Sequence, residues 1–358
     1  FMLLWIGQGS NAMVLWMDLI ARPILVIALT GSAVQLGLVS MARGIPMLVL
    51  SPYAGVLADR IDRRRVLLAS KGMSMVLYGI FVALILTGSL ELWHVYVTAL
   101  AKSSLNAFDQ PARHALLPSL IPRRLLMNAV ALLSGTMQIS RLGGAAFAGF
   151  LIGLWALAFG LQEDQTQAFG GVYLIVSIMS VAAFSATYPI SVPLAGRPQS
   201  TTDSWFTSLM EGLRYARRSP VIMGVLLLFA IQSAFGMPYQ QVFVPWLAIE
   251  VLDIGPGGAG MLIAVASAGS FASALMLATW GHLLRNRGWL ILTGLVVFGL
   301  ALAALGFSTL LSPTVLLGLT VPILPMIILV FVGLAQNALM TIKNGLLLET
   351  TPNELRGR

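Results

Sequence analysis

Four ionisable side chains interrupt long apolar runs in the first half of the chain, one acid among three bases: Asp18, Arg22, Arg43 and Arg141. Asp18 and Arg22 are four residues apart, so on a helix they form a neighbouring pair. Buried charges of this kind pair with one another, either as a structural ion network or as a site for protons or an anionic substrate. The residues favour neither reading. Three cations hold the carboxylate ionised, so Asp18 carries a proton only if the network opens.

The sequence lacks the residue patterns that metal binding, enzymatic catalysis or ATP hydrolysis would need. The chain has no cysteine, and its three histidines, His94, His114 and His282, have no ligand spacing, so we expect no metal site. We find no paired acids, histidine cluster or activated serine at one depth, and no phosphate-binding Gly-x-x-x-x-Gly-Lys-Ser/Thr loop. We therefore expect neither an enzyme nor an ATP-driven pump, and no cofactor.

The composition of the chain predicts which structural elements position these charges. Of 358 residues, 58% are hydrophobic and only 9% charged, and the mean hydropathy is +0.90, whereas a soluble domain is about a quarter charged. The chain is therefore an integral membrane protein. Ten apolar runs approach or exceed the length that a bilayer-spanning helix needs: 1–28, 34–58, 66–88, 91–109, 127–158, 171–193, 220–248, 257–284, 288–311 and 317–347.

The basic residues predict an orientation. Fifteen of the 21 Lys and Arg residues fall in loops on one side of these spans, and the opposite loops hold none. This asymmetry predicts that the amino terminus and the central loop lie in the cytoplasm. We expect the protein itself to lie in the cytoplasmic (inner) membrane of the cell. The membrane orientation then explains the net charge of +8, and we expect no nucleic-acid partner. Lys71, Lys102 and Lys343 are expected near cytoplasmic ends, where their ammonium groups can reach water.

The spans divide into two halves. We expect a six-helix bundle over 1–193, a cytoplasmic linker with an amphipathic helix over 194–219, and a second bundle over 220–358. The stretches 116–125 and 346–355 share a pattern at an offset of 230 residues, each after the fourth span of its half. This repeat predicts six plus six helices, the last two lying beyond the sequence, and a natural ten-helix protein is the alternative.

The stretch "GVLADRIDRRR" after the second span resembles the signature loop of the major facilitator superfamily. Gly55, Leu57, Asp59, Arg60, Arg63 and Arg64 match, and Asp62 replaces a glycine. The stretches 108–132, 211–220 and 351–358 resemble the drug and siderophore exporters of that superfamily, a branch that includes the enterobactin exporter. The resemblance implies an all-α fold of two pseudo-symmetric helix bundles. It also implies a cytoplasmic latch of Asp59 with Arg63 and Arg113; a loop that only anchors topology is the alternative.

Two further sets of residues follow from the resemblance. In the fifth span, Arg141, Gly144 and Gly149 match a glycine-rich antiporter segment whose proline is Ala145 here; small residues also simply allow tight helix packing. The first, fourth, seventh and tenth helices line the central cavity in this superfamily. The candidate cavity residues are Gln8, Asn11, Asn106, Gln232, Tyr239, Gln240, Gln336 and Asn337, for each of which an interhelical hydrogen bond is the competing explanation.

The sequence therefore predicts a secondary active transporter, a monomer in the lipid bilayer that exports amphipathic small molecules and is driven by a proton gradient. An importer of the same superfamily is one alternative, and a non-transporting membrane sensor or assembly protein is another.

Overall fold

The computed structural model describes residues 1–60, 62–120, 126–162, 165–190, 210, 214, 217–236, 238–280, 287–308, 314–316 and 319–350. The chain forms two compact units. The first comprises Phe1–Thr202 with Gly255–Gly260, and the second comprises Asp203–Ile254 with Met261–Arg358. Most of the predicted linker, 194–219, lies outside the described residues.

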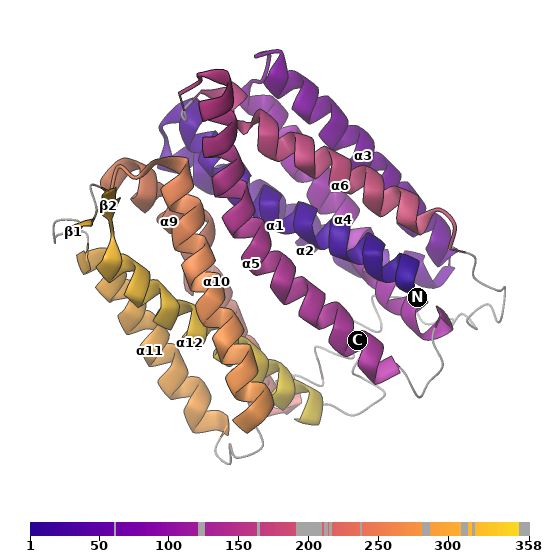
Figure 1. Ribbon diagram of the computed structural model, residues 1–358. Coiled ribbons are helices and arrows are strands. Elements are labelled where there is room, and N and C mark those ends of the chain that lie inside the picture. The colour runs from indigo at the N-terminus through magenta and orange to yellow at the C-terminus, as the bar shows by residue number, and fades with distance from the viewer. Residues whose placement is uncertain are drawn as a thin grey trace. The chain divides into compact units, whose positions relative to one another are not determined.

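The first unit is built from long helices that lie side by side (Figure 1). They are α1 (Met2–Thr30), α2 (Ala33–Arg60), α3 (Arg63–Leu86), α4 (Leu92–Leu120), α5 (Leu126–Phe159) and α6 (Gly170–Thr187), with the short 3₁₀ helix η2 (Thr166–Phe169) before α6. α1 packs against α5 and α6, whereas α4 packs against α2 and α3. Helices of this length can span a bilayer. Each helix also satisfies its own backbone hydrogen bonds, which lipid cannot do.

The second unit begins with a helix that changes its winding. α8 (Pro220–Ile231) leads into three π-helical segments, η3 (Gln232–Gly236), η4 (Tyr239–Phe243) and η5 (Leu247–Val251), with α9 (Val244–Trp246) between the last two. Pro238 and Pro245 lie in this stretch, and proline lacks the N–H that a regular α-helix uses. π-Helical turns of this kind are frequent at functional sites.

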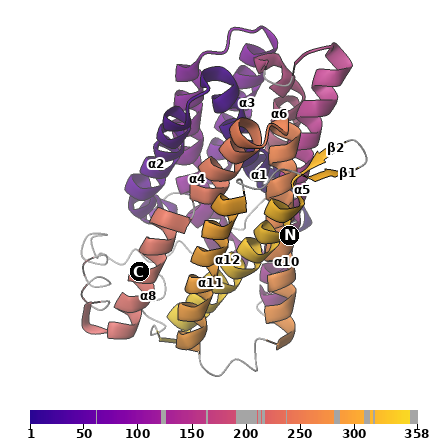
Figure 2. The same ribbon diagram turned by 90° about the vertical axis from the view of Figure 1, so that its left-hand side faces the viewer.

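The rest of the second unit consists of α10 (Gly255–Trp280), α11 (Arg287–Phe307) and α12 (Ile323–Thr350). Two short antiparallel strands, β1 (Thr314–Leu316) and β2 (Leu319–Val321), precede α12 (Figure 2). The sequence predicted a helical span from about residue 317, which is wrong at its start: Leu319–Val321 pairs with Thr314–Leu316 as a strand, and α12 begins only at Ile323, after Pro322.

Among the described residues, nine helices are long and apolar enough to cross a membrane. α4 is also long enough, but Lys102, Asp109 and Arg113 make it more polar, and with it the helices correspond to the ten predicted runs. Large apolar side chains such as Leu48, at 80% exposure, and Leu157, at 82%, lie on the helix surfaces. A water-soluble protein would bury such residues, whereas lipid accepts them.

Glycines set two close helix contacts. A β-carbon at Gly144 in α5 would lie 2.7 Å from the Cβ of Trp16 in α1, so α5 and α1 approach where only glycine fits. In the second unit, a β-carbon at Gly333 in α12 would collide with the carbonyl oxygen of Ala266 in α10. Gly149, five residues after Gly144 on α5, is buried.

Candidate functional site

The centre of the first unit holds a buried carboxylate with several donors, which we name the Asp18 cluster: Asp18, Arg22, Arg43 and Tyr173. Asp18 and Arg22 are 2% and 1% exposed. Arg22 Nη2 lies 2.7 Å and Arg22 Nε 3.1 Å from Asp18 Oδ1, so the pair makes two charge-assisted hydrogen bonds. Tyr173 Oη of α6 donates to the same oxygen at 3.2 Å, and Arg43 Nη1 of α2 lies 3.8 Å from Oδ2.

The guanidinium of Arg22 also contacts α4 and α3. Its Nη1 donates to the carbonyl oxygen of Val95 at 3.1 Å and to Thr98 Oγ1 at 2.7 Å. The guanidinium also lies over the ring of Phe81, 5.1 Å from the centroid, where the ring face attracts a cation. The Asp18 cluster therefore links α1, α2, α3, α4 and α6, and each charge has the partners that burial in a bilayer requires.

Arg141, the fourth predicted member of this network, has a different neighbour. Its guanidinium lies over the indole ring of Trp16, 5.2 Å from the centroid. The structure therefore brings together three of the four predicted charges, Asp18, Arg22 and Arg43. Arg141 connects α5 to α1 through an aromatic ring beside the Gly144 contact.

A second set of buried charges, the Asp109 cluster, was not predicted from the sequence: Asp109, Lys71, Arg113 and Gln8. Arg113 Nη1 lies 3.2 Å from Asp109 Oδ2, and Lys71 Nζ of α3 lies 3.6 Å from Oδ1. Arg113 Nη1 also donates to Gln8 Oε1 of α1 at 2.5 Å. The sequence placed Arg113 in a loop, but α4 continues to Leu120 and buries it. The i,i+4 spacing of Asp109 and Arg113 was the available signal.

Lys102 lies on α4 between the two clusters. The sequence placed its ammonium group within reach of water, yet Lys102 is 5% exposed, and Lys71 and Lys343 are buried too. Its Nζ donates to Ser74 Oγ of α3 at 3.0 Å and lies over the ring of Tyr78, 5.6 Å from the centroid. Within the described residues it forms no ion pair.

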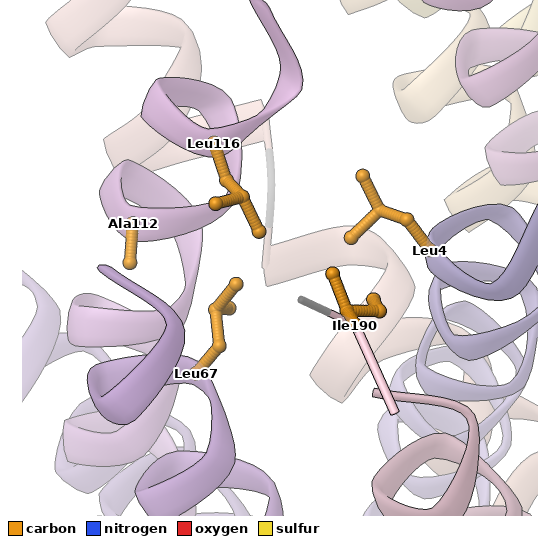
Figure 3. Packing of buried hydrophobic residues seen from close by; sticks show 5 residues of the cluster. All are labelled: Leu4, Leu67, Ala112, Leu116 and Ile190. Atoms are coloured by element: carbon orange, nitrogen blue, oxygen red, sulfur yellow. The ribbon is translucent and has the colours of Figure 1, made fainter. Parts of the chain in front are cut away.

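An apolar cluster closes the end of the first unit next to the Asp109 cluster. Leu4, Leu67, Ala112, Leu116 and Ile190 are all buried there, and Figure 3 shows the side chains of Leu4 and Ile190 facing those of Leu67 and Leu116. Leu4 is one turn before Gln8 on α1, and Leu116 is one turn after Arg113 on α4. The apolar cluster therefore separates the buried charges from that end of the helices.

The second unit repeats one of these contacts. Lys343 of α12 donates to Gln232 Oε1 in η3 and lies over the ring of Phe229, 4.4 Å from the centroid. Arg113 and Lys343 are 230 residues apart, which is the offset of the two sequence repeats. In both halves, therefore, a cation on the fourth helix binds a glutamine on the first helix of that half.

The remaining predicted cavity residues are distributed over both units. Tyr239 Oη in η4 donates to Gln336 Oε1 of α12 at 2.9 Å, an interhelical hydrogen bond. Gln240 is 7% exposed, and its Nε2 has no hydrogen-bond partner in the described part of the chain. Asn337 is also buried, whereas Asn11 and Asn106 are half-buried. No group of three His, Asp or Glu that could hold a metal ion occurs among the residues described.

The predicted latch falls mostly outside the described side chains, which omit those of Gly55, Asp59, Arg60 and Arg63. Arg64 is described: its Nη2 donates to the carbonyl oxygen of Tyr188 at 2.7 Å, next to the end of α6. The Asp62 side chain accepts from the Arg64 N–H at 2.9 Å and caps α3. The described partners of Arg113 are Asp109 and Gln8, so its pairing with Asp59 stays a prediction.

The family model of the Major Facilitator Superfamily matches residues 4–358, which is nearly the whole chain. The chain belongs to the major facilitator superfamily. The predicted resemblance is therefore confirmed, as is an all-α, multi-pass membrane fold apart from the short hairpin. A total of twelve helices stays a prediction.

Several curated relatives of this superfamily member are efflux proteins. It is 24% identical over 314 residues to Macrolide efflux protein A of Streptococcus pyogenes, covering 86% of this chain and 72% of the relative. It is 25% identical over 368 residues to the Multidrug efflux pump Tap of Mycolicibacterium fortuitum, covering 100% and 82%. It is 27% identical over 307 residues to the Enterobactin exporter EntS of Citrobacter koseri, covering 84% and 67%.

A solved structure shows the same fold. The crystal structure of a bacterial homologue of the human lysosomal transporter Spinster, inward-facing and unoccupied, aligns with a TM-score of 0.70. The alignment covers 96% of this superfamily member and 73% of that chain at 17% identity, so it supports the fold and carries no information on substrate.

Proposed function

We propose that this superfamily member is a secondary active transporter that exports amphipathic small molecules of the drug or siderophore class in exchange for protons. The observation that carries the proposal is the match to the superfamily over residues 4–358, together with efflux proteins for macrolides, multiple drugs and enterobactin among its relatives. It acts as a monomer by alternating access, with the amino terminus and the linker in the cytoplasm.

The buried charges support this proposal in two ways. Ionisable residues inside a membrane bundle are costly, so their presence marks a functional pathway more often than packing alone. The Asp18 and Asp109 clusters also tie α1, α2, α3, α4 and α6 into one body. A rigid bundle of this kind is what rocking between two access states needs.

The candidate residues then divide by role. Asp59 forms a latch with Arg63 and Arg113 that holds helix ends in one access state and releases them in the other. Substrate contacts come from the polar side chains of the π-helical stretch and α12. Gln240 is buried there, and its Nε2 donor has no partner in the part of the chain that the structure describes. A buried amide without a partner is unfavourable, and a bound ligand would satisfy it.

The test is transport by purified protein in liposomes whose interior is more acidic than the medium, for protein inserted inside out. The panel contains erythromycin as a macrolide, ethidium as an amphipathic cation and enterobactin as a siderophore. We expect the wild type to concentrate at least one compound inside the vesicles, and a protonophore to abolish the accumulation. Asp59→Asn at equal incorporation is the matched variant and should lose most of the flux. Binding without flux for every compound would reject transport, and flux without dependence on the pH gradient would reject proton coupling.

A further inference from the structure

α3 and α4 face one another along a row of polar side chains, which we name the seam: Lys71, Ser74, Tyr78, Thr98, Lys102 and Asp109. On α3 the intervals are three and four residues, and on α4 they are four and seven, so each set lies on one helix face. At one end of the seam Thr98 accepts from Arg22 of the Asp18 cluster. At the other end Lys71 pairs with Asp109, and Lys102 with Ser74 and Tyr78 lies between these ends.

The carboxylates at both ends of the seam already form ion pairs and hydrogen bonds. Asp18 accepts from Arg22 and Tyr173, and Asp109 binds Arg113 and Lys71. Arginine stays protonated in proteins, so each carboxylate has a permanent cation beside it and is stabilised as the anion. Protonating either acid would leave a buried arginine without its counter-ion, which costs several kcal/mol.

Lys102 differs from these groups in its surroundings. Its nitrogen has a hydroxyl and a ring face as neighbours, and within the described residues no carboxylate forms an ion pair with it. A buried lysine, unlike an arginine, can release its proton and remain in place as a neutral amine. Lys102 can therefore change its charge without breaking an ion pair of either cluster. It lies ten residues into α4, about 15 Å along the helix, near the middle of a bilayer about 30 Å thick.

We propose that Lys102 carries the transported proton. The lone pair on Nζ accepts a proton from a hydronium ion that enters from the outside, so an N–H bond forms and water is left. After the change of access the same N–H bond breaks, and the proton passes to water on the cytoplasmic side. One proton moves inward for each cycle in which substrate moves outward. This inference rests on the proposed proton-coupled export and assigns its coupling residue.

The groups that face Lys102 set the electrostatics of this step. From α3 they are Lys71 and Tyr78, from α2 Arg43, and from α1 Asp18; on α4 itself it is Asp109, two turns away. Both acids favour the ammonium form and both cations oppose it. These groups belong to the same rigid body as Lys102, so the change of access alters which side's water reaches Lys102 and leaves these distances as they are.

Transport by variants tests the proposal in the liposome assay, with the panel compound that the wild type concentrates. Lys102→Met and Lys102→Arg should both still exchange labelled for unlabelled compound. Neither variant should concentrate the compound in response to a pH gradient, because the methionine side chain binds no proton and the arginine side chain releases none. Lys71→Arg is the matched control: Lys71 pairs with Asp109 and needs only its charge, so proton-driven accumulation should persist. If Lys102→Arg concentrates the compound as the wild type does, Lys102 is a structural cation and the proposal is overturned.

A second measurement needs no substrate. The lysines of this sequence are Lys71, Lys102 and Lys343. In protein labelled with ¹³C at the lysine ε-carbon, the signal that Lys102→Arg removes from the NMR spectrum in detergent is therefore that of Lys102. We expect the Lys102 signal to shift with protonation within the pH range of transport. A Lys102 that stays charged, or stays neutral, throughout that range overturns the inference even where export is proton-driven. If the wild type ignores the pH gradient, the proposed function fails instead, and the NMR titration still decides whether Lys102 exchanges its proton.

Discussion

Replacing Asp18 with asparagine tests whether the Asp18 cluster holds the first unit together. Asparagine has nearly the same shape but no negative charge, so the change removes the counter-ion of a buried arginine while leaving the packing almost intact. Arg22 is 1% exposed, and its Nε and Nη2 both point to the carboxylate. Arg22 cannot release its proton, so its charge would remain buried and only partly compensated.

The expected loss follows from this geometry. Removing one partner of a buried ion pair costs about 3–5 kcal/mol. For a unit of about 200 residues, 1 kcal/mol shifts the melting temperature by about 2–4 °C, so we expect a decrease of roughly 6–20 °C in detergent. Thermal unfolding followed by light scattering or an environment-sensitive dye measures it. The double variant Asp18→Asn with Arg22→Gln should recover part of the loss, because the unpaired cation is gone.

Asp62→Asn is the matched control, since it makes the same chemical change at an exposed site. The side chains of Asp62 and Arg65 are 52% and 82% exposed and 3.7 Å apart, so their pairing contributes at most about 1 kcal/mol. Asparagine also caps a helix as well as aspartate does. A melting temperature of Asp18→Asn equal to that of Asp62→Asn would refute the structural role of the cluster. If that stable variant also exchanged substrate but failed to concentrate it, Asp18 and not Lys102 would carry the proton.

Three further predictions concern single contacts. Asp59→Asn should leave the melting temperature unchanged and reduce flux severely, and wild-type flux at equal expression would reduce the loop to a topology anchor. Tyr173→Phe removes the hydroxyl donor of Asp18 without changing any charge, so it should lower stability by about 1.5–3 kcal/mol in thermal unfolding, less than Asp18→Asn; an equal loss would contradict the charge argument. Gly333→Ala places a methyl group against a carbonyl oxygen of α10 and should cost about 1–3 kcal/mol, whereas Gly299→Ala, which points into open space, should be neutral or stabilising by the same measurement.

The Asp18–Arg22 pair shows which part of the site the sequence could predict. The two residues are four apart inside an apolar run, and any helix brings such residues together regardless of its neighbours. The same local logic gave the spans, since twenty apolar residues fill a bilayer as a helix in any fold. The superfamily followed from the loop at 55–65, whose motif is contiguous in the sequence.

Arg141 and Lys102 show what only the tertiary structure decided. Depth in the membrane put Arg141 near Asp18, but depth fixes neither the rotation of α5 nor its neighbours, and the Gly144 contact sets Arg141 against Trp16. Lys102 was expected to reach water because a lysine side chain is long. The register of α3 against α4 placed Ser74 and Tyr78 beside it instead.

Residues that meet across the bundle could not be read from the chain. Gln8 and Arg113 are 105 residues apart and share a hydrogen bond, and Gln232 and Lys343 are 111 apart and share another. In lipid no hydrophobic force selects partners, so the contacts of each helix depend on small residues and on which polar groups face each other. The sequence by itself determined which segments enter the membrane and that Asp18 and Arg22 form a pair inside it. The packing of those segments decided that two carboxylates have arginine partners, whereas Lys102, between them, has a hydroxyl and a ring face and no ion pair within the described residues.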